Sequence, residues 1–99
     1  MAKFMYLYYA GKETDAGDDA AWGAWFGSLG DKLVDAGNPL DSTGAQAVHA
    51  GGKMAVTDRP ATGYSIVDVN DMQEALMLAK SCPLVMSDGA VAVYEALPM

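Results

Sequence analysis

The chain has 99 residues, of which 52% are apolar, and its 6 basic and 13 acidic residues give a formal net charge of −7. This length predicts a single domain over residues 1–99. The acidic balance, without a Lys/Arg cluster, argues against binding to nucleic acid or to an anionic membrane surface. One cysteine, Cys82, and one histidine, His49, exclude an intrachain disulfide, a thiolate metal site and a multi-histidine metal site. We therefore expect no metal and no cofactor, and the apolar surplus indicates that a partner covers part of the surface.

The first predicted element is a strand over residues 4–9, where every position is apolar or aromatic. Because both alternating sets are apolar, we expect this strand to be buried on both faces. The residues before it contain no basic region followed by a long apolar run, so we expect no signal peptide and a cytoplasmic protein. No apolar run in the chain reaches the roughly 20 residues that a membrane-spanning helix needs.

Residues 18–36 form the second predicted element, an amphipathic helix that holds both tryptophans. Helical periodicity predicts a buried stripe of Trp22, Phe26, Leu29 and Leu33, with Trp25 beside it. A second stripe consists of Gly23, Gly27 and Gly30, and each glycine inside a helix costs about 1 kcal/mol relative to alanine. One interpretation is that the glycines allow close approach of another backbone or leave space for the indoles. The other is a groove floored by glycine and walled by indole, in which a flat ligand lies.

The region 38–63 is rich in small and polar residues and contains a predicted β-hairpin. Its strands, 45–50 and 53–57, flank Gly51-Gly52, and a two-residue glycine turn between two strands is typical of hairpins. In this register His49 lies across from Met54. Gly37, just before this region, is expected to adopt the left-handed conformation that ends the preceding helix.

Three further elements complete the prediction: a strand over 63–69, a helix that ends near Ser81, and a strand over 89–95. Alternation places Tyr64, Ile66 and Asp68 on one face of the first of these strands. The helix can begin with a capping box formed by Asn70 with Gln73 or by Asp71 with Glu74. Its buried stripe is expected to comprise Met72, Ala75, Leu76 and Ala79.

The order of predicted elements is βαββαβ with a hairpin inserted or substituted in the middle, which is typical of a ferredoxin-like α+β fold. Both helices would cover one side of an antiparallel sheet and leave the other side bare. That bare side is apolar, because the first strand has two apolar faces. We therefore expect a symmetric homodimer in which two sheets pack face to face.

Several stretches carry a family resemblance over nearly the whole chain: residues 3–9, Trp25, 35–40, 63–69, Glu74-Ala75, Cys82-Pro83 and 89–95. In these stretches the chain resembles the YCII-related family of small dimeric α+β-barrel proteins. The resemblance implies a homodimer in which two sheets form a barrel with the helices outside, and it implies no particular reaction. Family members with a suggested active pair have a histidine in the first helix and an aspartate before the proline that follows the second helix. This chain has no histidine in its first helix and has Cys82 before Pro83, so no catalytic role is carried over.

The catalytic candidates are few. His49 is the only side chain that titrates near neutral pH without a perturbed environment, and as a general base it needs a carboxylate to orient it. Asp68 and Glu95 lie on predicted strands among apolar residues, where burial would raise the pKa of a carboxyl group. Cys82 follows a helix C-terminus, where the helix dipole disfavours a thiolate, so we expect a packed thiol there.

Four aromatic residues are candidates for a ligand site: Tyr6, Trp22, Trp25 and Tyr64. The first functional hypothesis is a domain that binds a small organic molecule or is purely structural. The second is a cofactor-independent enzyme that acts on a small organic substrate through His49 with Asp68 or Glu95. The third is a protein-interaction module whose bare sheet face receives a different protein.

Overall fold

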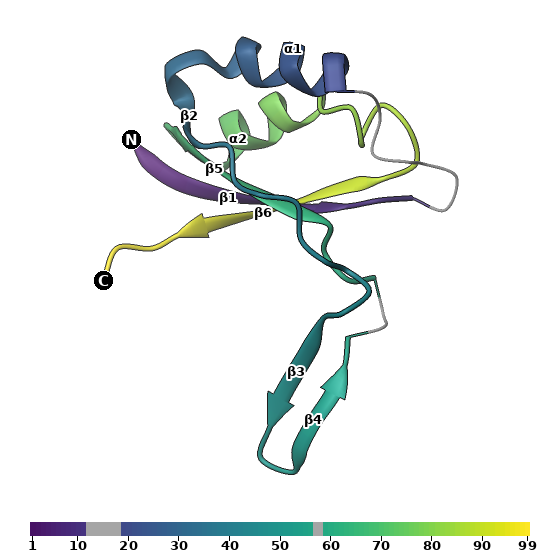
Figure 1. Ribbon diagram of the computed structural model, residues 1–99. Coiled ribbons are helices and arrows are strands. Elements are labelled where there is room, and N and C mark those ends of the chain that lie inside the picture. The colour runs from purple at the N-terminus through teal and green to yellow at the C-terminus, as the bar shows by residue number, and fades with distance from the viewer. Residues whose placement is uncertain (12–18, 57–58) are drawn as a thin grey trace.

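The protein is described here by a computed structural model, which places residues 1–11, 19–56 and 59–99. Figure 1 shows the arrangement of its elements. The helices are α1 (Asp19–Leu29) and α2 (Met72–Ala79), with a short 3₁₀ helix, η1 (Gly30–Lys32). The strands are β1 (Ala2–Tyr9), β2 (Leu33–Asp35), β3 (Gln46–His49), β4 (Gly52–Ala55), β5 (Gly63–Val69) and β6 (Ala90–Ala96).

Four of these strands form one sheet in the order β2–β5–β1–β6, and each neighbouring pair is antiparallel. Both helices lie over the same face of this sheet, so the chain is an α+β protein with two layers (Figure 1). Within the described ranges the sheet is open and does not close into a barrel. Neither helix is long and apolar enough to cross a membrane, as far as the described residues go.

The core lies between the sheet and the two helices. Burial alternates along β1 and β5, so every second residue of each strand points toward the helices. The buried hydrophobic residues are Phe4, Tyr6, Tyr8, Trp25, Leu29, Val67, Val69, Ala75, Ala79, Cys82 and Leu84. Two hydrogen bonds tie α2 to this core: the Tyr6 hydroxyl donates to the carbonyl of Ala75 at 2.5 Å, and the Trp25 indole N–H donates to that of Leu78 at 3.1 Å.

The face of the sheet opposite the helices is uncovered and largely apolar. Met5 and Leu7 of β1 lie on it, and they pair with Ile66 and Tyr64 of β5. These four side chains are half-buried, whereas the alternate residues of β1 are buried. The prediction that β1 is buried on both faces therefore applies to only one face within a single chain.

Helix α1 ends at Leu29, seven residues earlier than its apolar periodicity predicts. Gly30 adopts a left-handed conformation with φ of 56°, and a single 3₁₀ turn follows. Leu33 then pairs with Val67 of β5, so the last apolar residue of the predicted helical stripe belongs to a strand. Sheet pairing with β5 supplies a backbone partner that local periodicity does not reveal.

Among the described residues of one chain, neither interpretation of the glycine stripe on α1 finds its expected neighbour. Gly23 and Gly27 are exposed, and a Cβ atom added at either position would meet no described atom within 4 Å outside its chain neighbours. Neither glycine lines the pocket described below. Their structural consequence is a helix that its aromatic contacts must hold in place, because glycine disfavours the helical conformation.

The predicted hairpin is present as β3 and β4, and it projects away from the sheet on the side opposite the helices (Figure 1). Its turn falls on Ala50-Gly51, one residue before the predicted turn, so His49 pairs with Gly52 and not with Met54. The reason is that Gly52, with φ of 133°, takes the strained position that follows the turn. Residue 57, at the end of the predicted second strand, lies outside the described residues.

Helix α2 begins at Asp71, the N-cap of the second predicted capping box, and the returning bond from Glu74 reaches the N–H of Asn70, one residue before the cap. A carboxylate oxygen of Asp71 accepts from the backbone N–H of Glu74 at 2.9 Å, and the Glu74 carboxylate accepts from the N–H of Asn70 at 2.8 Å. Ala75 and Ala79 are buried as predicted, whereas the predicted Met72 and Leu76 are 38% and 46% exposed. The helix presents a narrow stripe of small residues to the sheet, because the large rings of β1 and α1 already fill the space beneath it.

Candidate functional site

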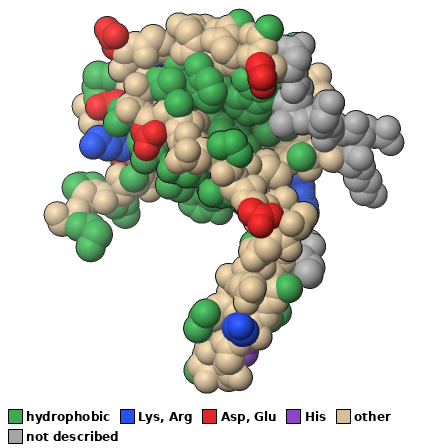
Figure 2. Space-filling model, viewed as in Figure 1, with side chains coloured by type: hydrophobic (Ala, Val, Ile, Leu, Met, Phe, Trp, Pro, Cys, Tyr) green, Lys and Arg blue, Asp and Glu red, His purple; other side chains and the backbone are tan. Residues whose placement is uncertain are grey.

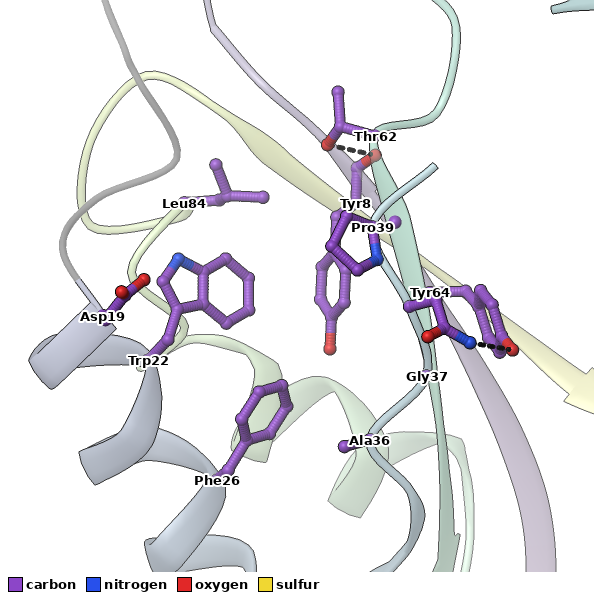
Figure 3. Close-up of a pocket in the computed structure, with 12 residues that line it drawn as sticks. Tyr8, Asp19, Trp22, Phe26, Ala36, Gly37, Pro39, Thr62, Tyr64 and Leu84 are labelled. Carbon is purple, nitrogen blue, oxygen red and sulfur yellow. Dashed lines mark hydrogen bonds between the residues drawn. The ribbon is translucent and has the colours of Figure 1, made fainter. Parts of the chain in front are cut away.

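A pocket of about 310 Å³ lies between α1, the end of the sheet and the segment 36–39 that follows β2. Figure 2 shows hydrophobic side chains gathered below α1 on this face of the molecule, with acidic side chains around them. The pocket is lined by Tyr8, Asp19, Trp22, Phe26, Ala36, Gly37, Asn38, Pro39, Thr62, Gly63, Tyr64 and Leu84. Figure 3 shows the rings of Tyr8, Trp22 and Phe26 pointing toward one another across it.

Three aromatic rings make the apolar wall of the pocket. The Trp22 ring meets the Tyr8 ring edge to face, with centroids 5.0 Å apart and planes at 79°. Phe26, one helical turn after Trp22, lies 5.6 Å from the same indole. Trp25 packs behind this wall, 5.8 Å from Trp22 and 6.2 Å from Tyr8. Such contacts stabilise ring positions beyond the burial of area, so the wall is preformed.

A relay of hydroxyl groups fixes the floor of the pocket. The Tyr8 hydroxyl donates to Oγ of Ser65 at 2.8 Å, and the Ser65 hydroxyl donates to the carbonyl of Ala36 at 2.6 Å. The relay therefore links β1, β5 and the segment after β2. Burial raises the pKa of Tyr8 well above its usual range, so the phenol is neutral at physiological pH. The relay also explains why Ser65, a polar residue, is fully buried in the core.

The wall opposite α1 depends on glycine at two positions. Gly37 has φ of 78°, and a Cβ atom there would lie 1.7 Å from the carbonyl oxygen of Tyr64. Gly63 forms an isolated bridge with Pro39, and a Cβ atom there would lie 3.3 Å from the Tyr8 ring. The left-handed conformation predicted for Gly37 is therefore confirmed, although the residue follows a strand and not a helix.

Thr62 completes this wall, because its N–H and hydroxyl both donate to the carbonyl of Tyr8, at 2.7 Å and 3.1 Å. Asn38 lies beside it, and its amide donates to the Tyr64 hydroxyl at 3.4 Å. The Tyr64 ring is at the outer edge of the pocket, beyond Gly37 (Figure 3). This wall is thus held by contacts between β1, β5 and the segment after β2.

Of the four aromatic residues proposed from the sequence as ligand-binding, Trp22 and Tyr64 line the pocket. Tyr6 and Trp25 lie beneath the pocket in the core. The hydroxyl of Tyr6 and the indole N–H of Trp25 each donate a hydrogen bond to a backbone carbonyl of α2. Desolvation by burial is the main cause that raises the pKa of Tyr6 to about 12. Their direct role is therefore to support the wall that Tyr8 and Trp22 form.

The three catalytic candidates do not come together within one chain. His49 is exposed at the end of β3, and its Nδ1 accepts a hydrogen bond from the N–H of Gly51. Asp68 lies on the uncovered face of the sheet, and Glu95 is exposed near the end of β6. The hairpin carries His49 away from the sheet that holds the two carboxylates (Figure 1). Cys82 is buried, and this burial raises the pKa of its thiol, which agrees with the packed role expected for it.

Sequence reasoning did not single out most of the other residues that line the pocket. Asn38 and Pro39 meet Thr62 and Gly63 through pairing across more than twenty residues, which no local pattern shows. Leu84 enters the pocket from the segment after α2, where the only signal is a short apolar run. Phe26 was assigned to the buried stripe of α1, and it serves as both core and pocket wall.

Within the described ranges, no group of three or more His, Cys, Asp or Glu side chains is arranged to hold a metal ion. A comparison with protein families finds that the model of the YCII-related domain matches residues 4–99. No curated protein matches the chain. The match covers the pocket, both helices and all six strands apart from the first residues of β1.

Proposed function

The chain belongs to the YCII-related family, and we propose that it is a homodimeric domain that binds a small organic molecule in the pocket between α1 and the sheet. The pocket is the observation that supports this proposal. Its volume of about 310 Å³ is at the lower end of the roughly 300–1,000 Å³ that is usual for small-molecule sites. Its lining is mostly apolar with a few polar groups at fixed positions, which is the common composition of such sites.

The preformed state of the pocket also supports binding. The aromatic wall is braced by Trp25, the floor by the Tyr8–Ser65 relay, and the opposite wall by the bridge between Pro39 and Gly63. A ligand that enters a site already in its bound shape does not have to order these side chains. Less of the interaction free energy is then lost to conformational entropy.

The second part of the proposal is the homodimer, in which the uncovered sheet faces of two copies pack together. The strand order β2–β5–β1–β6 supports the ferredoxin-like topology that exposes this face. Met5, Leu7 and Ile66 give it an apolar centre. At its end Lys3 pairs with Asp68, so a two-fold arrangement can bring opposite charges of two copies together.

Two further features favour a second copy on this face. Oδ1 of Asp68 is buried and has no hydrogen-bond partner among the described residues, and a buried polar atom without a partner costs about 1–3 kcal/mol. A donor from a second copy would remove that cost. The hairpin projects on the same side as the uncovered face (Figure 1). Val48 and Met54 on it are 85% and 59% exposed, so a second copy would also find apolar contacts there.

A fragment screen followed by NMR tests the pocket. We expect small aromatic compounds to shift the backbone amide signals of Gly37 and Gly63, since both residues line the cavity. Ala36→Trp, which places an indole at the mouth of the pocket, should abolish these shifts. The matched control is Ala24→Trp, an exposed position on α1 outside the lining, which should leave them unchanged. If no compound shifts the pocket amides, or if both variants behave alike, the pocket is not a binding site.

Sedimentation equilibrium tests the dimer. The proposal predicts a mass of twice the 10.4 kDa of one chain. Ile66→Glu, which buries a charge in the proposed contact, should convert the protein to monomer. Met77→Glu, on the exposed side of α2, should not. A wild-type protein that sediments as a monomer at all concentrations would refute the sheet-to-sheet contact. The cytoplasmic location expected from the sequence stays a prediction.

A further inference from the structure

Two hydroxyl groups of the pocket lining, those of Tyr8 and Thr62, present hydrogen-bond acceptors. The two hydroxyl groups in its floor and wall have already committed their protons: Tyr8 donates to Ser65, and Thr62 donates to the carbonyl of Tyr8. Each hydroxyl oxygen keeps lone pairs, because a hydroxyl group has one proton and two acceptor sites. One proton of the Asn38 amide is likewise directed to Tyr64. A ligand group that donates hydrogen bonds therefore fits these atoms better than one that accepts them.

The charge of the lining also favours a ligand that carries a positive charge. Among the described residues that line the pocket there is one carboxylate, Asp19, and no Lys, Arg or His. Asp19 begins α1, one turn before Trp22, and the two side chains lie next to each other in Figure 3. The net charge of −7 adds a negative field over the whole chain, which raises the local concentration of cations. An anionic ligand would find no positive side chain in this lining.

The aromatic rings of the pocket can also interact with a cation. The pocket exposes parts of the Tyr8, Trp22 and Phe26 rings, and two of these ring planes stand at 79° to each other. An ammonium group near the face of such a ring is attracted by the negative charge of its π-system. The same rings bury the apolar body of a ligand that carries this group.

We propose, on the premise that the pocket binds a small molecule, that its ligand is a primary or substituted organic amine with an apolar body. Its charged nitrogen donates to the acceptors of the pocket and approaches Asp19, and its apolar part packs against Trp22 and Phe26. The proposed ligand thus has one end that donates hydrogen bonds and one apolar end.

The test compares three probes of nearly equal size by NMR titration of the pocket amides: 2-phenylethylamine, which is a cation at pH 7, neutral 2-phenylethanol, and the anion phenylacetate. We expect the amine to bind about three- to tenfold more tightly than the alcohol, from one exposed charge pair and one cation–π contact. Phenylacetate should bind most weakly. Raising the salt concentration should reduce the preference for the amine, because salt screens exposed charges.

A pair of variants locates the charge. Asp19→Asn should weaken amine binding by about threefold, as expected for an exposed ion pair, and leave alcohol binding unchanged. The control is Asp31→Asn, an exposed aspartate of η1 outside the pocket lining, which should change neither affinity. If the alcohol or phenylacetate binds as tightly as the amine, or if the two variants have equal effects, the amine proposal is wrong while the pocket still binds small molecules. If the fragment screen finds no ligand at all, the proposed function itself fails, and the amine proposal fails with it.

Discussion

Alanine at Gly23 and Gly27 should stabilise the protein. Both glycines lie on the exposed side of α1, and a Cβ atom at either position would meet no described atom within 4 Å. The substitutions therefore change no packing contact among the described residues. They change only the conformational preference of the backbone, since glycine has more freedom in the unfolded chain than alanine.

The magnitude follows from helix propensity. Alanine is favoured over glycine by about 1 kcal/mol in a helix interior. Gly23 is in the middle of α1 and should give this full value, whereas Gly27 is two residues from the end at Leu29 and should give less. Together they should add about 1.5 kcal/mol to the free energy of unfolding. For a domain of this size the thermal midpoint should rise by roughly 6–12 °C.

The assay is thermal unfolding followed by circular dichroism at one fixed protein concentration, because dimer formation makes the midpoint depend on concentration. Gly30→Ala is the control from the same stripe. Gly30 has φ of 56°, and an L-residue in that conformation costs about 1–2 kcal/mol. This variant should therefore lower the midpoint. If Gly23→Ala lowers the midpoint as well, another surface packs against the glycines of α1, and the reasoning from their exposure is refuted.

Three further predictions concern single side chains. Asp71→Ala removes the N-cap of α2 and should lower the free energy of unfolding in urea by about 1 kcal/mol, and an unchanged value would show that the cap does not contribute. Cys82 is buried, and its raised pKa keeps the thiol protonated. A thiol reagent should therefore label it in the folded protein far more slowly than in denaturant, and equal rates would contradict the packed role. Asp41 accepts hydrogen bonds, first from the Thr43 hydroxyl, that lower its pKa from the usual value of an aspartate. Its contribution to stability should persist above the unfolded pKa and disappear as the pH falls through the folded pKa, and an NMR titration in which the midpoint of Asp41 is not lower in the folded than in the unfolded protein would be inconsistent with these bonds.

Strands β1, β5 and β6, the hairpin and α2 could be predicted from the sequence because local signals determine them, whereas β2 lies inside the helix predicted over residues 18–36. Alternation along residues 63–69, the apolar run of residues 4–9 and the N-cap at Asp71 all act within a few residues, and each of these elements is present in the structure. The α+β class follows from their order. The end of α1 could not be predicted, because Leu33 continues the helical period but gains backbone pairing with Val67, which lies far away in the sequence.

The pocket was predictable only in part, for the same reason. The sequence predicts Trp22 and Tyr64 as candidates, because an indole can wall a groove and a strand tyrosine can line a cavity with its polar tip. The opposite wall depends on the bridge between Pro39 and Gly63, a contact between residues far apart in the sequence that the pairing of β2 with β5 brings together. His49 is a candidate from the sequence because it is the only histidine, yet the fold places it on the exposed hairpin, where no carboxylate among the described residues forms an ion pair with it.

A crystal structure of the protein grown with 2-phenylethylamine tests the central claim most directly, because it locates the ligand. The account predicts density for the amine in the pocket, with its ring against Trp22 and Phe26 and its nitrogen toward Asp19 and the floor hydroxyl of Tyr8. Density elsewhere on the molecule, or a pocket that stays empty at saturating amine, would contradict the assignment of this cavity as the binding site.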